Sequence, residues 1–207
     1  FGDAPVAPGP QAPWNDVLGA LNELGIGEAA LVGNSFGAAV ALRVAVTAPD
    51  RVRELALVSA PVEEVEQSER LTAAWAAEEE ALERGDVDAA ARAVVDAWTL
   101  ADSPAALRER VAAMYRHGID VQLAAEEPEE APDPVEDDPG WPSRVTMPVL
   151  LVAGERDMPD MQAGVQVLSG HLHHARREFI PGAGHLAPLE TPDAFRSLLL
   201  DFLVASP

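Results

Sequence analysis

The sequence predicts an α/β protein with a doubly wound, mostly parallel sheet that is interrupted by a helical insertion. Short, nearly continuous apolar runs closed by Gly, Pro or Ser alternate with amphipathic segments, a pattern typical of buried parallel strands joined by helices. The alternation stops between Val62 and Gly140, where helical segments follow one another and no strand is evident.

Four apolar runs are predicted as strands. They are "AALVG" (29–33), "ELALVSA" (54–60), "MPVLLVAG" (147–154) and "REFIPG" (177–182). Each run is short and ends at residues that favour a turn. Because a central parallel strand is covered on both faces, apolar runs without polar alternation fit this position.

Helices are predicted between and around these strands. Gly25 ends the first and Pro49 follows the second, while Thr191 and Pro192 supply an N-cap and a first helical residue for the last. The predicted helices of this part span residues 15–24, 36–48, 158–168 and 192–204.

The insertion is predicted to contain helices at residues 64–83, 87–99 and 104–116. It ends in the tract "EEPEEAPDPVEDDPG" (126–140), which holds eight acidic residues and four prolines. Such a composition argues against a packed element, so we expect a solvated linker that is mobile over residues 126–139.

Composition excludes several classes of function. Acidic residues outnumber basic ones 35 to 14, and the net charge of −21 repels nucleic acid and anionic lipid surfaces, so neither is expected as a partner. The chain has no cysteine, which excludes disulfides and thiolate catalysis. No apolar run approaches the roughly 20 residues that span a bilayer, and we expect a cytoplasmic protein. The chain begins with "FGDAPVAPGP" and without Met, so we expect the natural N-terminus to be missing.

Ser35 is the candidate nucleophile. In "GNSFG", Gly33, Ser35 and Gly37 match the G-x-S-x-G pattern between a predicted strand and a predicted helix, the context that a nucleophile elbow requires. The glycines relieve crowding at the sharp turn, and the helix N-terminus presents the N–H of Phe36 as an oxyanion donor. The alternative is a small-residue turn with an inert serine.

Asp157 and His185 are the candidate partners of this serine. A serine hydroxyl needs a base to take its proton, and the base needs an orienting acid. Asp157 follows the third predicted strand and His185 the fourth, and the carboxyl ends of parallel strands converge. Asp160 is the alternative acid, although it falls at the start of the next helix.

Further residues are candidates with structural alternatives. Histidines 171, 173 and 174 in "HLHHARR" could hold a metal, but a polar helix end explains them better, and His117 is explained in the same way. Asn34, Trp75 and Trp98 are candidates for substrate binding. Trp75 and Trp98, together with Met114 and Tyr115, fit either a pocket lining or a helical core.

The chain resembles the α/β-hydrolase superfamily in its cap-bearing, lipase-, esterase- and lactonase-like branch. The resemblance rests on "GNSFG", "PDRVRELALVSAP", "MPVLLVAGERD" and "PGAGHLAPLETPDAF", in the family's order. It implies Ser35 as nucleophile, His185 as general base and then acid, and Asp157 as the orienting carboxylate. It also implies an α/β core at residues 1–61 and 141–207 with a helical cap and acidic linker at 62–140.

The resemblance implies hydrolysis of a small carboxylic ester or lactone through an acyl-enzyme on Ser35, without a metal or cofactor. C–C bond hydrolysis, cofactor-free perhydrolysis and a non-catalytic binding scaffold are the alternatives. The family's first strands, and the loop that supplies the second oxyanion N–H, have no counterpart in this sequence. We therefore expect this chain to lack N-terminal strands, and the missing half of the fold to be a possible partner.

Overall fold

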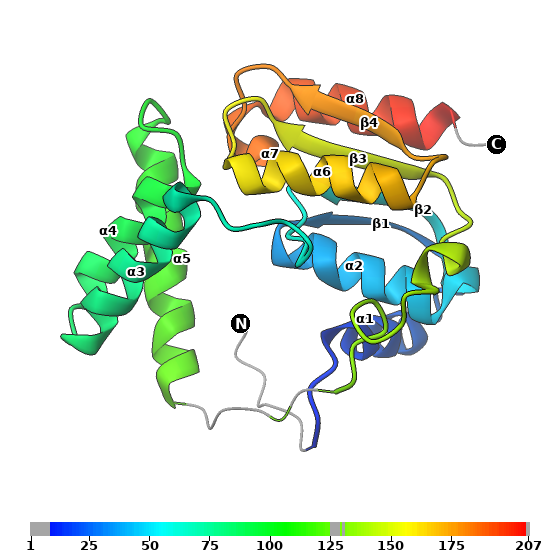
Figure 1. Ribbon diagram of the computed structural model, residues 1–207, viewed down its shortest axis with the longest axis horizontal. Helices are drawn as coiled ribbons and strands as arrows, with labels where there is room; N and C mark the ends of the chain where they lie inside the picture. The colour runs from blue at the N-terminus through cyan, green and yellow to red at the C-terminus, as the bar shows by residue number, and fades with distance from the viewer. Residues whose placement is uncertain (1–8, 125–128, 130, 206–207) are drawn as a thin grey trace. The chain divides into compact units, whose positions relative to one another are not determined.

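A computed structural model of the chain describes residues 9–124, 129 and 131–205 (Figure 1). The chain divides into two compact units. The smaller unit comprises Gln67–Glu129 with the N-terminal residues up to Gln11, and the larger comprises Ala12–Glu66 and Glu130–Pro207. Within the described residues, the larger unit carries all the strands and the smaller unit only helices.

The larger unit is a parallel α/β sheet, as the sequence predicted. Its four strands lie in the order β1-β2-β3-β4, so each strand pairs with the next one along the chain. The strands are β1 (Ala29–Asn34), β2 (Val52–Val58), β3 (Val149–Gly154) and β4 (Arg176–Ile180). The helices are α1 (Pro13–Glu23), α2 (Phe36–Thr47), η1 (Pro49–Arg51), η2 (Trp141–Arg144), α6 (Pro159–His171), α7 (Ala187–Glu190) and α8 (Pro192–Ala205).

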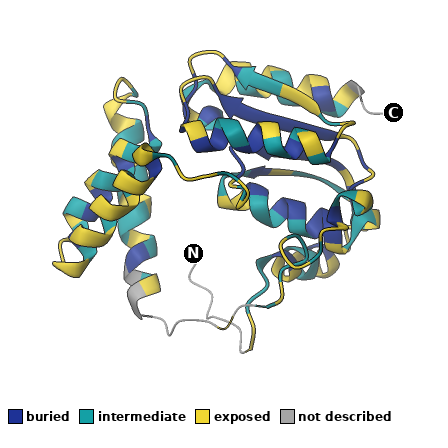
Figure 2. Ribbon diagram, viewed as in Figure 1, coloured by how far each residue is buried: buried dark blue, intermediate teal, exposed yellow. Residues whose placement is uncertain are grey.

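The sheet separates two apolar clusters, one on each face. Successive side chains of a strand point to opposite faces, so in β2 Leu55 and Leu57 join one cluster and Ala56 and Val58 the other. The first cluster includes residues of α1, α2 and α6, and the second includes Phe202 of α8. Helices therefore cover both faces, which explains why β3 is buried along its whole length (Figure 2).

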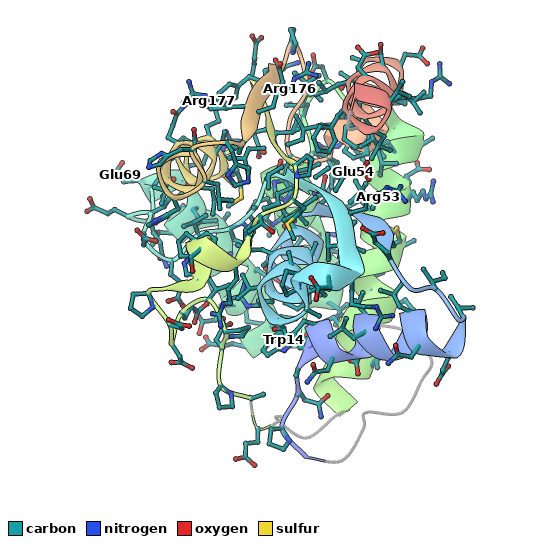
Figure 3. All side chains as sticks on the ribbon, turned by 90° about the vertical axis from the view of Figure 1, so that its right-hand side faces the viewer. Trp14, Arg53, Glu54, Glu69, Arg176 and Arg177 are labelled. Carbon is teal, nitrogen blue, oxygen red and sulfur yellow. The ribbon has the colours of Figure 1, made fainter. Side chains whose placement is uncertain are left out.

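Helix α2 lies against β1 and β2 through small side chains. Ala38, Val44 and Ala45 are fully buried, which lets the helix approach the sheet closely. Trp14 of α1 joins the same cluster and is labelled in Figure 3. The amino end of β2 carries Arg53 and the buried Glu54, which are labelled in Figure 3. Nε of Arg53 lies 2.9 Å from Oε2 of Glu54.

The smaller unit is built from three long helices: α3 (Glu69–Glu83), α4 (Val87–Trp98) and α5 (Ala105–Ala124). The side chains of Ser68 and Asp86 cap α3 and α4 by accepting backbone N–H groups. Tyr115 of α5 donates its hydroxyl to Glu78 of α3 at 2.7 Å. Among the helices that the structure describes, none is both long and apolar enough to cross a bilayer.

The end of the acidic tract belongs to the larger unit and contacts α2 there, which its composition alone did not predict. Arg43 of α2 binds Asp133 at 2.5 Å and Glu136 at 2.6 Å. Ala131 and Val135 pack against the first apolar cluster. Residues 131–139 are therefore held by ion pairs and apolar contacts, whereas residues 126–128 and 130 of the expected linker lie outside the described part of the chain.

Candidate active site

Ser35 lies at the turn between β1 and α2, as the motif predicted. Its backbone angles are φ 56° and ψ −125°, a left-handed conformation that costs a non-glycine residue energy. Its N–H donates to the carbonyl of Val58 at 2.8 Å, which extends the β1–β2 ladder to the serine itself. The serine is thus fixed at the carboxyl edge of the sheet.

Gly33 is required by the close approach of the helix. A Cβ atom at this position would stand 2.2 Å from the carbonyl oxygen of Gly37, so no side chain fits. Phe36 is the first residue of α2, so its N–H has no carbonyl one turn earlier in the helix to pair with. Phe36 is 68% exposed.

Asp157 and His185 meet through their side chains, and both are buried. Nδ1 of His185 lies 3.1 Å from Oδ1 of Asp157. The same carboxylate oxygen accepts the N–H of Met158 at 2.7 Å. Asp157 thus contacts one ring nitrogen of His185, and the alternative acid, Asp160, is buried in the first turn of α6.

The loops that carry these two residues are joined by backbone hydrogen bonds. The N–H of Glu155 donates to Ile180, and the N–H of Arg156 to Ala183 at 2.8 Å. Gly154 permits this approach, because a Cβ atom there would stand 2.2 Å from the carbonyl oxygen of Ala183. The loop after β3 and the loop after β4 therefore form one packed unit.

The loop of His185 has two further attachments. Oε2 of Glu190 accepts the N–H of Gly184 at 2.8 Å. The side-chain amide of Asn34 donates to the carbonyl of His185 at 3.4 Å, which ties the residue before Ser35 to the histidine loop. Asn34 was expected to contact substrate; its Oδ1 atom is buried and has no partner within the described residues.

Sequence reasoning missed Ser59, which lies directly after β2. Its side chain is fully buried, and its hydroxyl donates to Oδ2 of Asp157 at 2.6 Å. No motif marks this serine. The only available signal was its position at the carboxyl end of a buried strand beside the strand of the nucleophile.

The other candidates have different surroundings in the two units. In the larger unit, His171 contacts Glu64 at 2.8 Å and the ring of Trp141, while His174 contacts the carbonyl of Met147. In the smaller unit, Trp75 is 45% and Met114 63% exposed. No group of three potential metal ligands occurs within the described ranges.

Comparison with known sequences gives two matches of different extent. A sequence model described as the alpha/beta hydrolase family matches residues 1–198. A 63-residue segment is 43% identical to the 2-hydroxymuconate semialdehyde hydrolase of Pseudomonas sp. (strain CF600), and it covers 30% of this chain and 22% of that relative. The chain therefore aligns with less than a quarter of that relative.

Solved structures resemble the chain over nearly its whole length. A hydrolase from Pseudomonas aeruginosa PA01 matches with a TM-score of 0.73 and 25% identity, over 99% of this chain and 76% of that one. The enol-lactonase from Burkholderia xenovorans LB400 matches with a TM-score of 0.69 and 23% identity, over 98% and 77%. A thermophilic esterase from Thermogutta terrifontis matches with a TM-score of 0.73 and 22% identity, over 99% and 76%. The last two show a shared fold.

Proposed function

The chain belongs to the alpha/beta hydrolase family, and from this premise we propose that it is a serine hydrolase that acts on carboxylic esters or lactones. The observation that carries the proposal is the buried contact between Nδ1 of His185 and Asp157. With Asp157 ionised, Nδ1 carries the proton and Nε2 is left as an acceptor, which is the tautomer a general base needs.

In the proposed reaction, His185 takes the proton of Ser35 as Oγ attacks the carbonyl carbon of the substrate. The imidazolium then returns this proton to the leaving alkoxide as the ester C–O bond breaks, which leaves an acyl group on Ser35. Water, deprotonated by His185, attacks the acyl carbon, and the acid leaves as Ser35 regains its proton. Asp157 stays ionised and holds the ring.

The N–H of Phe36 is the proposed donor to the oxyanion. It stands at the N-terminus of a 12-residue helix, where the unpaired N–H groups and the helix dipole favour negative charge. One such donor contributes about a hundredfold in rate or more. Phe36 directly follows Ser35 in the chain, which supports this assignment.

C–C bond hydrolysis is a second candidate, favoured by the segment that is 43% identical to 2-hydroxymuconate semialdehyde hydrolase. That reaction would use the same three side chains but would cleave a carbon–carbon bond beside a carbonyl group. Perhydrolysis and a non-catalytic scaffold are further alternatives. The substrate distinguishes the catalytic candidates, and labelling of Ser35 distinguishes an enzyme from a scaffold.

The test combines labelling with a substrate panel. We expect a fluorophosphonate probe to label the chain on Ser35 and to leave Ser35→Ala unlabelled. We also expect Ser35-dependent turnover with p-nitrophenyl esters of graded acyl length or with aliphatic lactones. Turnover of a dienol semialdehyde alone would favour the second candidate. A chain that takes no label and turns over no substrate would support the scaffold.

A further inference from the structure

Ser59 adopts a backbone conformation that serine rarely tolerates. Its φ angle is 50°, and within the described residues Ser35 is the only other non-glycine residue with a positive φ. The two serines follow adjacent strands, β2 and β1, at the same edge of the sheet. Glycine would adopt this conformation at a lower cost, so a serine at this position calls for a contribution from its hydroxyl.

The hydroxyl of Ser59 binds the second carboxylate oxygen of Asp157. Oδ1 of Asp157 receives the N–H of Met158 and faces Nδ1 of His185, whereas Oδ2 accepts the hydroxyl of Ser59 at 2.6 Å. The N–H of Ser59 donates to Val152 of β3 at 2.7 Å, so the backbone that carries the hydroxyl is itself fixed by the sheet.

We propose that Ser59 is a positioning residue, which holds the Asp157 carboxylate in the orientation that presents Oδ1 to His185. This inference rests on the proposed serine hydrolase function. Hydrogen bonds to both oxygens restrict the rotation of a carboxylate more than hydrogen bonds to one oxygen do. Hydrogen bonds to an ionised, buried acceptor are also stronger than neutral ones.

Two variants separate the hydroxyl from the backbone conformation. Ser59→Ala and Ser59→Gly both remove the hydroxyl, but glycine relieves the positive φ, so Ser59→Gly should melt at a higher temperature than Ser59→Ala. We expect kcat to fall on the order of tenfold in both variants, with KM within about twofold of the wild type. Activity that follows thermal stability instead would assign Ser59 a purely structural role and overturn the proposal.

A double-mutant cycle tests whether Ser59 acts through Asp157. In an Asp157→Asn background the charged acceptor is gone, so Ser59→Gly should change kcat much less than it does in the wild-type background. Equal fold-losses in both backgrounds would contradict the proposal. Ser143→Gly is the matched control, because Ser143 is exposed and donates only to the local carbonyl of Gly140 in the described structure.

A measurement without substrate separates this inference from the proposed function. The ¹³Cγ resonance of Asp157, assigned by its loss in Asp157→Asn, reports the hydrogen bond to Oδ2 directly. We expect it to shift in both Ser59 variants and to stay in place in Ser143→Gly. An unchanged resonance overturns the role of Ser59 whatever the turnover, whereas a shift in a chain that lacks Ser35-dependent turnover overturns only the proposed function.

Discussion

A Cβ atom on Gly154 would stand 2.2 Å from the carbonyl oxygen of Ala183, two residues before His185. The obstacle is backbone, so it cannot swing aside as a flexible side chain would. The end of β3 thereby sets the position of the loop that carries the histidine. Any side chain at residue 154 must push this loop away from Asp157.

Gly154→Ala should therefore impair both stability and turnover. We expect the free energy of unfolding to fall by about 2 kcal/mol, as for other overpacked sites. Ser35-dependent turnover should fall more than tenfold, because a displacement of about 1 Å in a reacting group can cost a hundredfold. Urea denaturation and steady-state kinetics measure the two effects.

Gly170→Ala is the matched control for this substitution. Gly170 lies in α6, and a Cβ atom there would meet nothing within 4 Å. Alanine is the better helix former, so the variant should gain about 0.5–1 kcal/mol and keep its turnover. If Gly154→Ala behaved like this control, the close contact between the two loops would not position His185.

The carboxylate of Glu190 should matter for turnover through Gly184. It accepts the N–H of the residue directly before His185 at 2.8 Å. Removal of a charged acceptor from a part-buried N–H costs about 1.5–3 kcal/mol, so Glu190→Ala should lower kcat about tenfold. Glu190→Gln keeps an acceptor oxygen and should retain most of the activity; equal losses in both variants would point to charge rather than to the hydrogen bond.

The free energy of unfolding should depend on pH through the carboxyl group of Glu136. Burial, followed by the charge of Asp133, raises the pKa of the Glu136 carboxyl, while Arg43 opposes the shift. The folded chain thus holds this proton more tightly than the unfolded chain does, and stability is lost as pH rises from the ordinary pKa of 4.5 through the raised value.

Glu136→Gln removes this loss, so its free energy of unfolding relative to that of the wild type should increase as the pH rises above the ordinary pKa of 4.5. Denaturant titrations at each pH measure this difference. Arg43→Met removes the positive charge that lowers the pKa of Glu136. In this variant the free energy of unfolding should therefore fall more steeply with rising pH than in the wild type. Parallel stability profiles for all three proteins would exclude Glu136 as the responsible group.

Charge at the edge of the sheet should reduce self-association. In the described sheet β1 pairs on one side only, with β2, and its Val32 is 46% exposed. Edge strands without charge invite pairing with other chains. Val32→Lys should lower light scattering on concentration more than Val204→Lys, which makes the same change on an exposed site of α8. Equal effects would show that net charge alone governs solubility.

Much of the fold was predictable because the buried strands are continuous apolar runs. The predicted strands at 29–33 and 147–154 correspond to β1 and β3 within two residues at each end. The end of α5 was not predictable: His117 and Gly118 look like a helix terminus, yet the helix continues to Ala124. The short helix α7 has four residues, too few for a periodic pattern.

The candidate site was predictable where chemistry has a local signature. Ser35 stands in a glycine-framed turn, and Asp157 and His185 follow strands, so the sequence was enough to nominate them. No local sequence pattern marks Ser59, because its proposed role depends on a hydrogen bond to Asp157, which lies 98 positions away in the sequence. Contacts of this kind can be predicted only when the register between β2 and β3 is known.

The acyl-enzyme on Ser35 is the central claim, and rapid-quench mass spectrometry tests it most directly. The chain is mixed with an activated ester, stopped in acid within the first turnover and digested. We predict that the peptide that contains Ser35 gains the mass of the acyl group, and that Ser35→Ala shows neither this gain nor turnover. Turnover that persists in Ser35→Ala, or an acyl group found on another residue, would contradict the account.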